Sequence, residues 1–146
     1  MHYETFRIIF VYENNRTMAN HKKIQPTESE LEILQVIWEK GEATVREVHD
    51  LLGEQKDVGY TTILKTMQIM HDKGLLDRDT SSRTHVYKPS VSQEKTQEHF
   101  LNKMIDGLYN GSAGRLVMGA LGHRKLSDND LKEIRDFLKQ FEKQQP

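Results

Sequence analysis

The side chains best suited to chemistry lie along residues 60–73, a stretch of helical periodicity that is followed by Gly74. Three apolar residues in it recur at spacings of four and three, which places them on one face of a helix: Ile63, Met67 and Met70. The opposite face carries Thr61, Lys65 and Gln68. One side of this helix is therefore suited to a core and the other to a polar partner.

The polar side chains match the hydrogen-bonding groups of nucleic acids. Lys65 can reach guanine O6 and N7 or a phosphate, and Gln68 can pair with adenine. Thr61 and Thr62 can bond phosphate oxygens or touch a thymine methyl. The amino end of the helix, near Tyr60, also favours phosphate because backbone N–H groups point outward there.

Each of these residues also has an ordinary structural interpretation. Lys65 could be a solvent-facing lysine, and Thr61 and Thr62 could merely begin the helix. Tyr60 fits a core aromatic about as well as a phosphate donor. Arg83 follows a polar turn, where it could reach a DNA backbone or minor groove or be one more turn residue. Periodicity alone predicts the fold and not DNA binding.

Other chemistries lack the residues they need. The chain has no cysteine, which excludes disulfides, thiolate metal sites and cysteine nucleophiles. Its seven histidines show no metal-ligand spacing, and there is neither a phosphate-cradling glycine loop nor a nucleophile elbow. No apolar run approaches the ~20 residues of a membrane span. We therefore expect no enzyme, no cofactor and no metal.

Charge is unevenly distributed, although the formal net charge is only −1. Between Gly59 and Lys88, five lysines and arginines accompany three aspartates, and His71 and His85 add positive charge when protonated. Carboxylates dominate residues 27–58. A weakly basic face on an acidic body suits a nucleic-acid partner. The same charges are also typical of an ordinary solvated surface.

Caps and glycines mark the elements that must position these residues. A Thr-x-x-Glu capping box opens a first helix at residues 27–40. A second box opens a short helix at 44–52, which we expect Gly53 to end. This second helix carries one apolar stripe, formed by Val45, Val48, Leu51 and Leu52. Beyond the third helix, residues 75–79 and 83–88 read as a β-hairpin. Three helices followed by a hairpin is the order of a winged helix-turn-helix domain.

The rest of the chain reads as three further helices, at 93–110, after Ser112 and after Ser127. They hold more large apolar residues than a short monomeric bundle could bury, so we expect a dimer surface. Its candidate residues are Phe100, Leu101, Met104, Leu108, Leu116, Leu121, Leu131, Ile134, Phe137 and Leu138. The alternative is that these helices fold back on the first domain.

Several separate motifs, in order, resemble the penicillinase repressor family of the BlaI/MecI/CopY type. They are TESELEILQVIW at 27–38, ATVREV at 43–48, GYTTI at 59–63, KGLL at 73–76, HVY at 85–87, NGS at 110–112 and the stretch 126–138. The resemblance spans about residues 24–141. It implies a homodimeric transcriptional repressor that sits on a palindromic operator of double-stranded DNA. The N-terminal winged helix would read DNA, and the C-terminal helices would dimerise.

The chain departs from the family pattern at three points. Copper-responsive members carry a C-terminal cysteine motif, which is absent here. Antibiotic-responsive members are released when a membrane metalloprotease sensor leads to a cut at an Asn-Phe bond in the first dimerisation helix. The corresponding region here has His99-Phe100 and Lys103-Met104, so the site of any such cut is unassigned. Many relatives also carry an arginine late in the third helix, where Ile69 stands here.

The sequence therefore predicts a mainly α protein with a small β-hairpin. A winged helix-turn-helix domain at residues 24–90 precedes a helical dimerisation domain at 91–146. We interpret residues 1–23 as a disordered arm or a wrongly assigned extension, with Met18 as an alternative start within it. The predicted function is cytoplasmic repression, with release by sensor-triggered proteolysis. The alternative is a protein-interaction module on a winged-helix scaffold without sequence-specific DNA binding.

Overall fold

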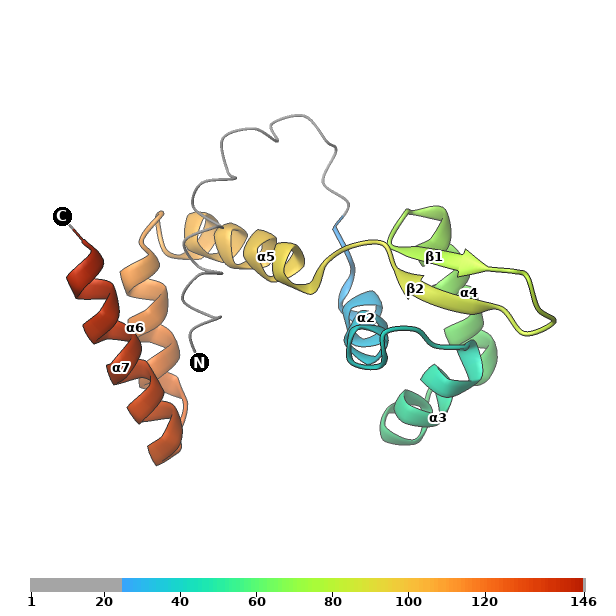
Figure 1. The fold of residues 1–146 in the computed structure, drawn as a ribbon, viewed down its shortest axis with the longest axis horizontal. Helices are drawn as coiled ribbons and strands as arrows, with labels where there is room; N and C mark the ends of the chain where they lie inside the picture. The colour runs from blue at the N-terminus through green and yellow to red at the C-terminus, as the bar shows by residue number, and fades with distance from the viewer. Residues whose placement is uncertain (1–24, 146) are drawn as a thin grey trace. The chain divides into compact units, whose positions relative to one another are not determined.

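A computed structural model describes residues 25–145, which form two compact units that divide between Ser92 and Gln93 (Figure 1). The first unit holds α2 (Glu28–Lys40), α3 (Val45–Lys56), α4 (Tyr60–Asp72), β1 (Leu76–Asp79) and β2 (Val86–Pro89). The second holds α5 (Gln93–Leu108), α6 (Ala113–His123) and α7 (Asp128–Gln144). The predicted mainly α fold with a winged helix-turn-helix domain is confirmed. The extension predicted for residues 1–23 lies outside the described part of the chain.

Both predicted capping boxes are present. The Thr27 side chain accepts from the Glu30 N–H, and the Glu30 carboxylate accepts from the Thr27 N–H, which fixes the start of α2. Gly41 ends this helix with a positive φ of 86°. At the start of α3, Thr44 and Glu47 form the same pair of bonds, and the bond from the Thr44 backbone lowers the pKa of the Glu47 carboxyl.

The predicted end of the second helix was wrong. α3 continues through Gly53 to Lys56, and Asp57 takes the left-handed conformation at its end. Gly53 instead allows a close approach, because an added Cβ would lie 2.8 Å from the His49 ring and 3.1 Å from the Val58 carbonyl oxygen. The predicted stripe is also narrower, since Leu51 is exposed while Leu52 packs against the core.

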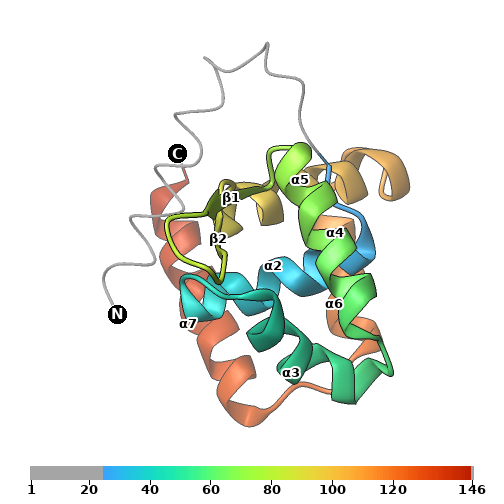
Figure 2. The same cartoon turned by 90° about the vertical axis from the view of Figure 1, so that its right-hand side faces the viewer.

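The core of the first unit lies among α2, α3, α4 and the hairpin (Figure 2). α4 contributes the three residues that its periodicity predicted, and α2 and α3 contribute apolar residues at helical spacing. The buried core consists of Ile33, Leu34, Ile37, Ala43, Val45, Val48, Ile63, Met67, Met70, Leu75, Leu76 and Tyr87. Burial of these side chains stabilises the unit and fixes which side of α4 faces outward.

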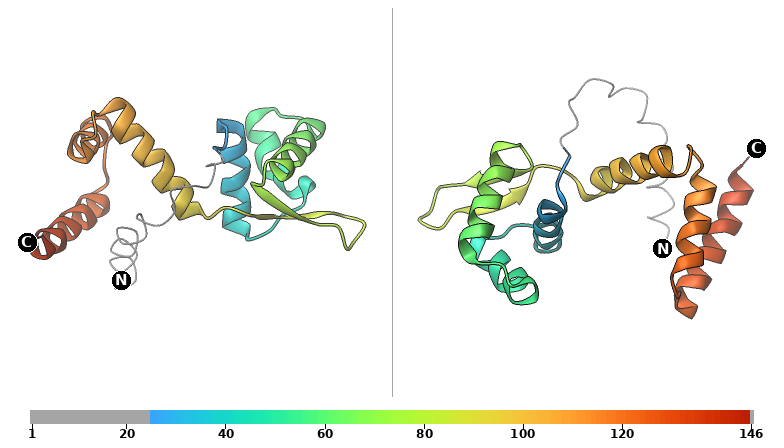
Figure 3. Two further views of the ribbon diagram at one scale, coloured as in Figure 1. Left: turned by 90° about the horizontal axis from the view of Figure 1, so that it is seen from above. Right: turned by 180° about the vertical axis from the view of Figure 1, so that it is seen from behind.

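The hairpin is attached to the helices through Tyr87. β1 pairs antiparallel with β2, with Arg78 opposite Tyr87. The Tyr87 backbone also exchanges two hydrogen bonds with Ala43, of 3.0 and 2.9 Å, just before α3. The strands are shorter than the sequence suggested, so the connecting loop runs from Thr80 to His85. Figure 3 shows this loop extending beyond the three helices.

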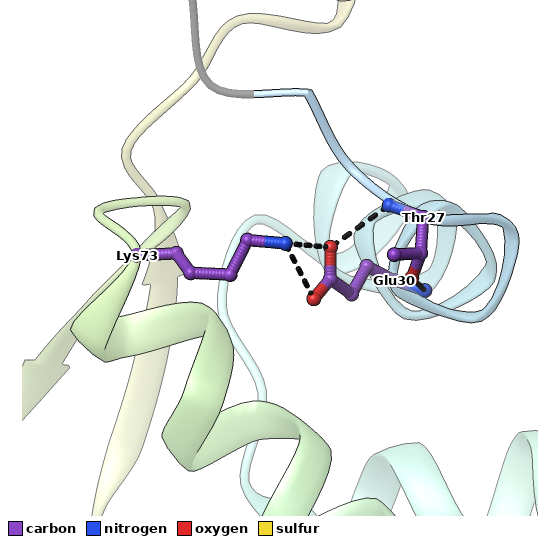
Figure 4. Close-up of polar contacts among 3 residues, drawn as sticks. All are labelled: Thr27, Glu30 and Lys73. Carbon is purple, nitrogen blue, oxygen red and sulfur yellow. Dashed lines mark hydrogen bonds and ion pairs between the residues drawn. The ribbon is translucent and has the colours of Figure 1, made fainter.

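A bidentate ion pair joins the start of α2 to the end of α4 (Figure 4). The Lys73 ammonium donates to both carboxylate oxygens of Glu30, at 2.9 and 2.8 Å. Glu30 is only 4% exposed, and one of its oxygens also accepts the Thr27 N–H. The same carboxylate therefore caps one helix and holds another.

The segment after β2 is held on the first unit. The Trp38 indole N–H donates to the Val91 carbonyl oxygen at 3.0 Å, and the Val91 side chain packs against the core. The division after Ser92 thus falls two residues beyond the predicted boundary at residue 90.

The second unit lacks an internal core. None of the residues of α5, α6 and α7, all of which the structure describes, is buried. A turn in which Asn110 and Gly111 both have positive φ connects α5 to α6. The two helices are in contact, and the Tyr109 side chain at this turn lies against Gly119 of α6. None of the helices described in either unit is long and apolar enough to cross a membrane.

We predict that Lys73→Met lowers the free energy of unfolding by about 2 kcal/mol, because it leaves the buried Glu30 carboxylate without its cation. Urea unfolding followed by fluorescence measures this in the first unit alone, since Trp38 is the single tryptophan. The control is Lys56→Met, which removes an exposed ion pair with Glu32 and should cost under about 1 kcal/mol. Equal losses in the two variants would contradict the structural role of the buried pair.

Candidate nucleic-acid interface

The predicted site residues of the third helix lie on the outward side of α4. Thr61, Thr62, Lys65 and Gln68 are exposed, and Ile63, Met67 and Met70 are buried on the other side. The Thr66 hydroxyl donates to the Thr62 carbonyl oxygen at 2.8 Å, so it is engaged within the helix. A polar, sterically open surface therefore runs along α4.

Tyr60 is 44% exposed at the first position of α4, so the alternative of a core aromatic is wrong. Its ring meets the His49 ring edge-on, with centroids 5.9 Å apart at 75°. His49 in turn lies against Gly53, so α3 and the turn before α4 hold the tyrosine at the edge of the surface. Nearly half of the Tyr60 surface is therefore accessible to a partner.

The amino terminus of α4 differs from those of α2 and α3. Its N-cap, Gly59, makes no side-chain hydrogen bond, and its first turn holds no acidic residue. The first N–H groups of a helix have no partner within it and carry partial positive charge. Since no side chain of the cap takes them up, these donors suit an external anion such as a phosphate.

The loop between β1 and β2 is organised by its own side chains. The Asp79 carboxylate accepts the Ser81 N–H at 2.8 Å, and this bond lowers the pKa of Asp79. The Ser82 hydroxyl donates to the Thr84 carbonyl oxygen at 2.7 Å. Arg83 lies between these bonds with its side chain exposed. The loop thus presents a cation at the edge of the unit.

Ion pairing separates the cations of the first unit into two groups. Lys40, Lys56, Lys73 and Lys88 pair with Glu47, Glu32, Glu30 and Glu42 respectively. Within residues 25–145, no salt bridge engages Arg46, Lys65, Arg78 or Arg83. Four of the glutamates that make the first unit acidic are therefore neutralised by lysines within the fold. Lys65 and Arg83, by contrast, have no carboxylate partner among the described residues and can interact with an external anion.

Sequence reasoning missed Arg46. It is exposed near the start of α3, away from the buried Val45 and Val48. It lies outside the basic segment 59–88, in the part of the sequence where carboxylates dominate, although its place beside the buried Val45 indicates an exposed position. The two histidines weighed with this charge also differ: His85 is exposed, whereas the His71 Nδ1 lies 3.0 Å from the Leu76 carbonyl oxygen. His71 therefore joins α4 to the hairpin.

The predicted dimerisation residues are gathered on α5, α6 and α7 with much of their surface accessible. Leu101, Met104, Leu108, Leu131, Phe137 and Leu138 are exposed, and Phe100, Leu116, Leu121 and Ile134 are half-buried. Leu108 reaches 74% exposure. Three further exposed apolar residues were not predicted: Val117, Met118 and Phe141.

Comparison with known proteins gives a consistent result. The family model described as penicillinase repressor matches residues 26–140. A penicillinase repressor of Staphylococcus aureus is 26% identical over 86% of this chain and 99% of its own length. The methicillin resistance regulatory protein MecI of Staphylococcus aureus is 26% identical over 82% of this chain and 97% of its own length.

The solved structures that resemble this chain include the monomeric form of Bacillus licheniformis BlaI in complex with the blaP half-operator. It is 29% identical in sequence, and the match covers 49% of this chain and 89% of that chain, with a TM-score of 0.44. The family match extends over most of the sequence and across both units. The chain therefore belongs to the penicillinase repressor family, whose members are transcriptional repressors and not enzymes.

Proposed function

We propose that this protein is a homodimeric repressor that binds a palindromic operator of double-stranded DNA through α4 and the β1–β2 loop. The observation that carries the proposal is the outward face of α4, where Thr61, Thr62, Lys65 and Gln68 are exposed together. These side chains fit the edges of bases in a major groove. We propose a cytoplasmic location as well, because a repressor acts where the chromosome lies.

Each part of the surface suits a different part of DNA. Lys65 and Gln68 lie where they can read base edges, while Tyr60 and the free N–H groups of α4 suit phosphates. Arg83 is exposed in the loop, from which it can reach the adjoining backbone or minor groove, and the exposed Arg46 adds a cation near the start of α3. Contacts with phosphate position the helix, and contacts with bases select the sequence.

The second unit supports the dimer. Three helices without one buried residue do not form a stable unit alone, because folding needs buried apolar surface to offset the loss of chain entropy. A second copy supplies the missing surface, and a two-fold axis matches the two halves of a palindrome. The ten apolar residues predicted for dimerisation would then share a common core.

We further propose that the repressor is released by proteolysis, which this arrangement permits. A cut in α5, in a pathway that begins at a membrane metalloprotease sensor, would separate the dimerising helices from the DNA-reading unit. α5 starts directly after the first unit ends, and none of its residues is buried in the single chain. Each half-site would then be held by one weakly bound unit.

We predict that the full chain retards a duplex from the region upstream of its own gene, and that the logarithm of its affinity falls linearly with the logarithm of salt concentration. Arg83→Ala should reduce the slope by about one per half-site, because one phosphate contact is lost. Gel shifts at several salt concentrations measure this. A folded dimer that shifts no duplex at low salt would favour the protein-interaction module instead.

We predict that Lys65→Ala weakens operator binding by about 1–3 kcal/mol if the lysine reads a base. Fluorescence anisotropy with operator and random duplexes measures the loss, which should be larger on the operator. Lys56→Ala is the control, since this lysine is already paired with Glu32 and should leave both affinities unchanged. Unchanged operator binding in Lys65→Ala would remove Lys65 from the interface.

We predict that a chain ending at Ser92 is a folded monomer that binds the operator poorly. The end point keeps the bond from Trp38 to Val91, so tryptophan fluorescence should remain native. Sedimentation measures the mass of the fragment, and Leu138→Asp in the full chain should likewise shift the equilibrium toward monomer. A dimeric fragment would place the interface in the first unit.

A further inference from the structure

One apolar side chain interrupts the polar outward face of α4. Ile69 is 45% exposed, follows Lys65 by one helical turn and lies beside Gln68. Among the described residues, Ile69 belongs neither to the buried core nor to the partly buried apolar residues packed against it. Ile63, Met67 and Met70 already complete the inward face. The Ile69 side chain is therefore available for contact with a partner outside the first unit.

We propose that Ile69 contacts the C5 methyl group of a thymine in each half-site, and so helps to select the operator sequence. This inference rests on the proposed function. The thymine methyl is the apolar group that base edges present in the major groove, and apolar side chains recognise it by contact. An isoleucine one turn beyond Lys65 selects thymine because every other base presents a polar or unmethylated edge there.

The charges around Ile69 argue for DNA rather than a protein as its partner. Lys65 stands four residues before it, is exposed and has no ion pair in the described part of the chain. A protein surface that covered Ile69 would also bury this ammonium, which is costly unless an acid is supplied. DNA supplies phosphates or guanine acceptors to Lys65 while a methyl group meets Ile69. The exposed Asp72 follows one turn later and disfavours further phosphates, so Ile69 is the last residue suited to the groove.

The test replaces each thymine of the upstream duplex in turn by uracil, which lacks only the methyl group. We expect the full wild-type chain to lose affinity about fourfold per half-site at one symmetric thymine position, the effect of one buried methyl group. Ile69→Ala should bind the unmodified duplex more weakly by a similar factor and should no longer distinguish uracil from thymine at that position. Ile69→Val should keep most of the distinction.

The control is Leu51→Ala, which trims an equally exposed apolar residue of α3 and should retain the full uracil effect. Trp38 fluorescence and sedimentation confirm that each variant is folded and dimeric. If no thymine is sensitive in the wild type, or if Ile69→Ala stays equally sensitive, the inference is wrong although the repressor function stands. A monomeric Ile69→Ala would show that protein covers this residue. Failure of the wild type to bind the unmodified duplex specifically would instead overturn the proposed function and the inference with it.

Discussion

The orientation of α4 depends on the Glu30 carboxylate. Two of its bonds go to Lys73 and one goes to the backbone of Thr27, so the start of α2 and the end of α4 are tied at one buried point. A bidentate, charge-assisted contact fixes direction as well as distance. At the other end, the Tyr60 ring rests against His49 of α3. The outward face of α4 is thus oriented by an ion pair at one end and by an aromatic contact at the other, while the core between them supplies most of the stability.

The two units use their apolar residues in opposite ways. In the first unit, a single chain completes the buried core, and the hairpin is joined to this core by the Tyr87–Ala43 bridge. In the second, even the large side chains of α5, α6 and α7 stay partly accessible. Leu108 and Met118 are exposed by 74% and 71%, values that suit residues awaiting a partner. The first unit thus has a complete core of its own, whereas the second does not, and this difference is the basis for the proposed dimer.

Local signals in the sequence predicted much of the fold. Threonine and serine caps, glycine stops and the spacing of Ile63, Met67 and Met70 act within a few residues, so they can be read directly. Gly53 was wrongly predicted to end α3, because a glycine can either end a helix or permit a close approach of another group. Which of the two applies depends on the tertiary neighbours of the glycine, which here are His49 and Val58. The pairing of Lys56 with Glu32 and of Lys73 with Glu30 could not be predicted from the sequence, since each pair joins residues far apart in the chain. The outward face of α4 was predictable, whereas the isolation of its charges was not.

In the proposed dimer, the missing core of α5, α6 and α7 would have a consequence for the amount of protein in the cell. When a unit gains its core only by association, mass action makes its stability rise with its own concentration. In dissociated copies these helices would unfold more often, and cellular proteases degrade unfolded chains. As growth dilutes the protein, degradation of dissociated copies would therefore make its concentration fall faster than dilution alone. Repression of a gene would then end abruptly below a threshold number of copies instead of declining gradually.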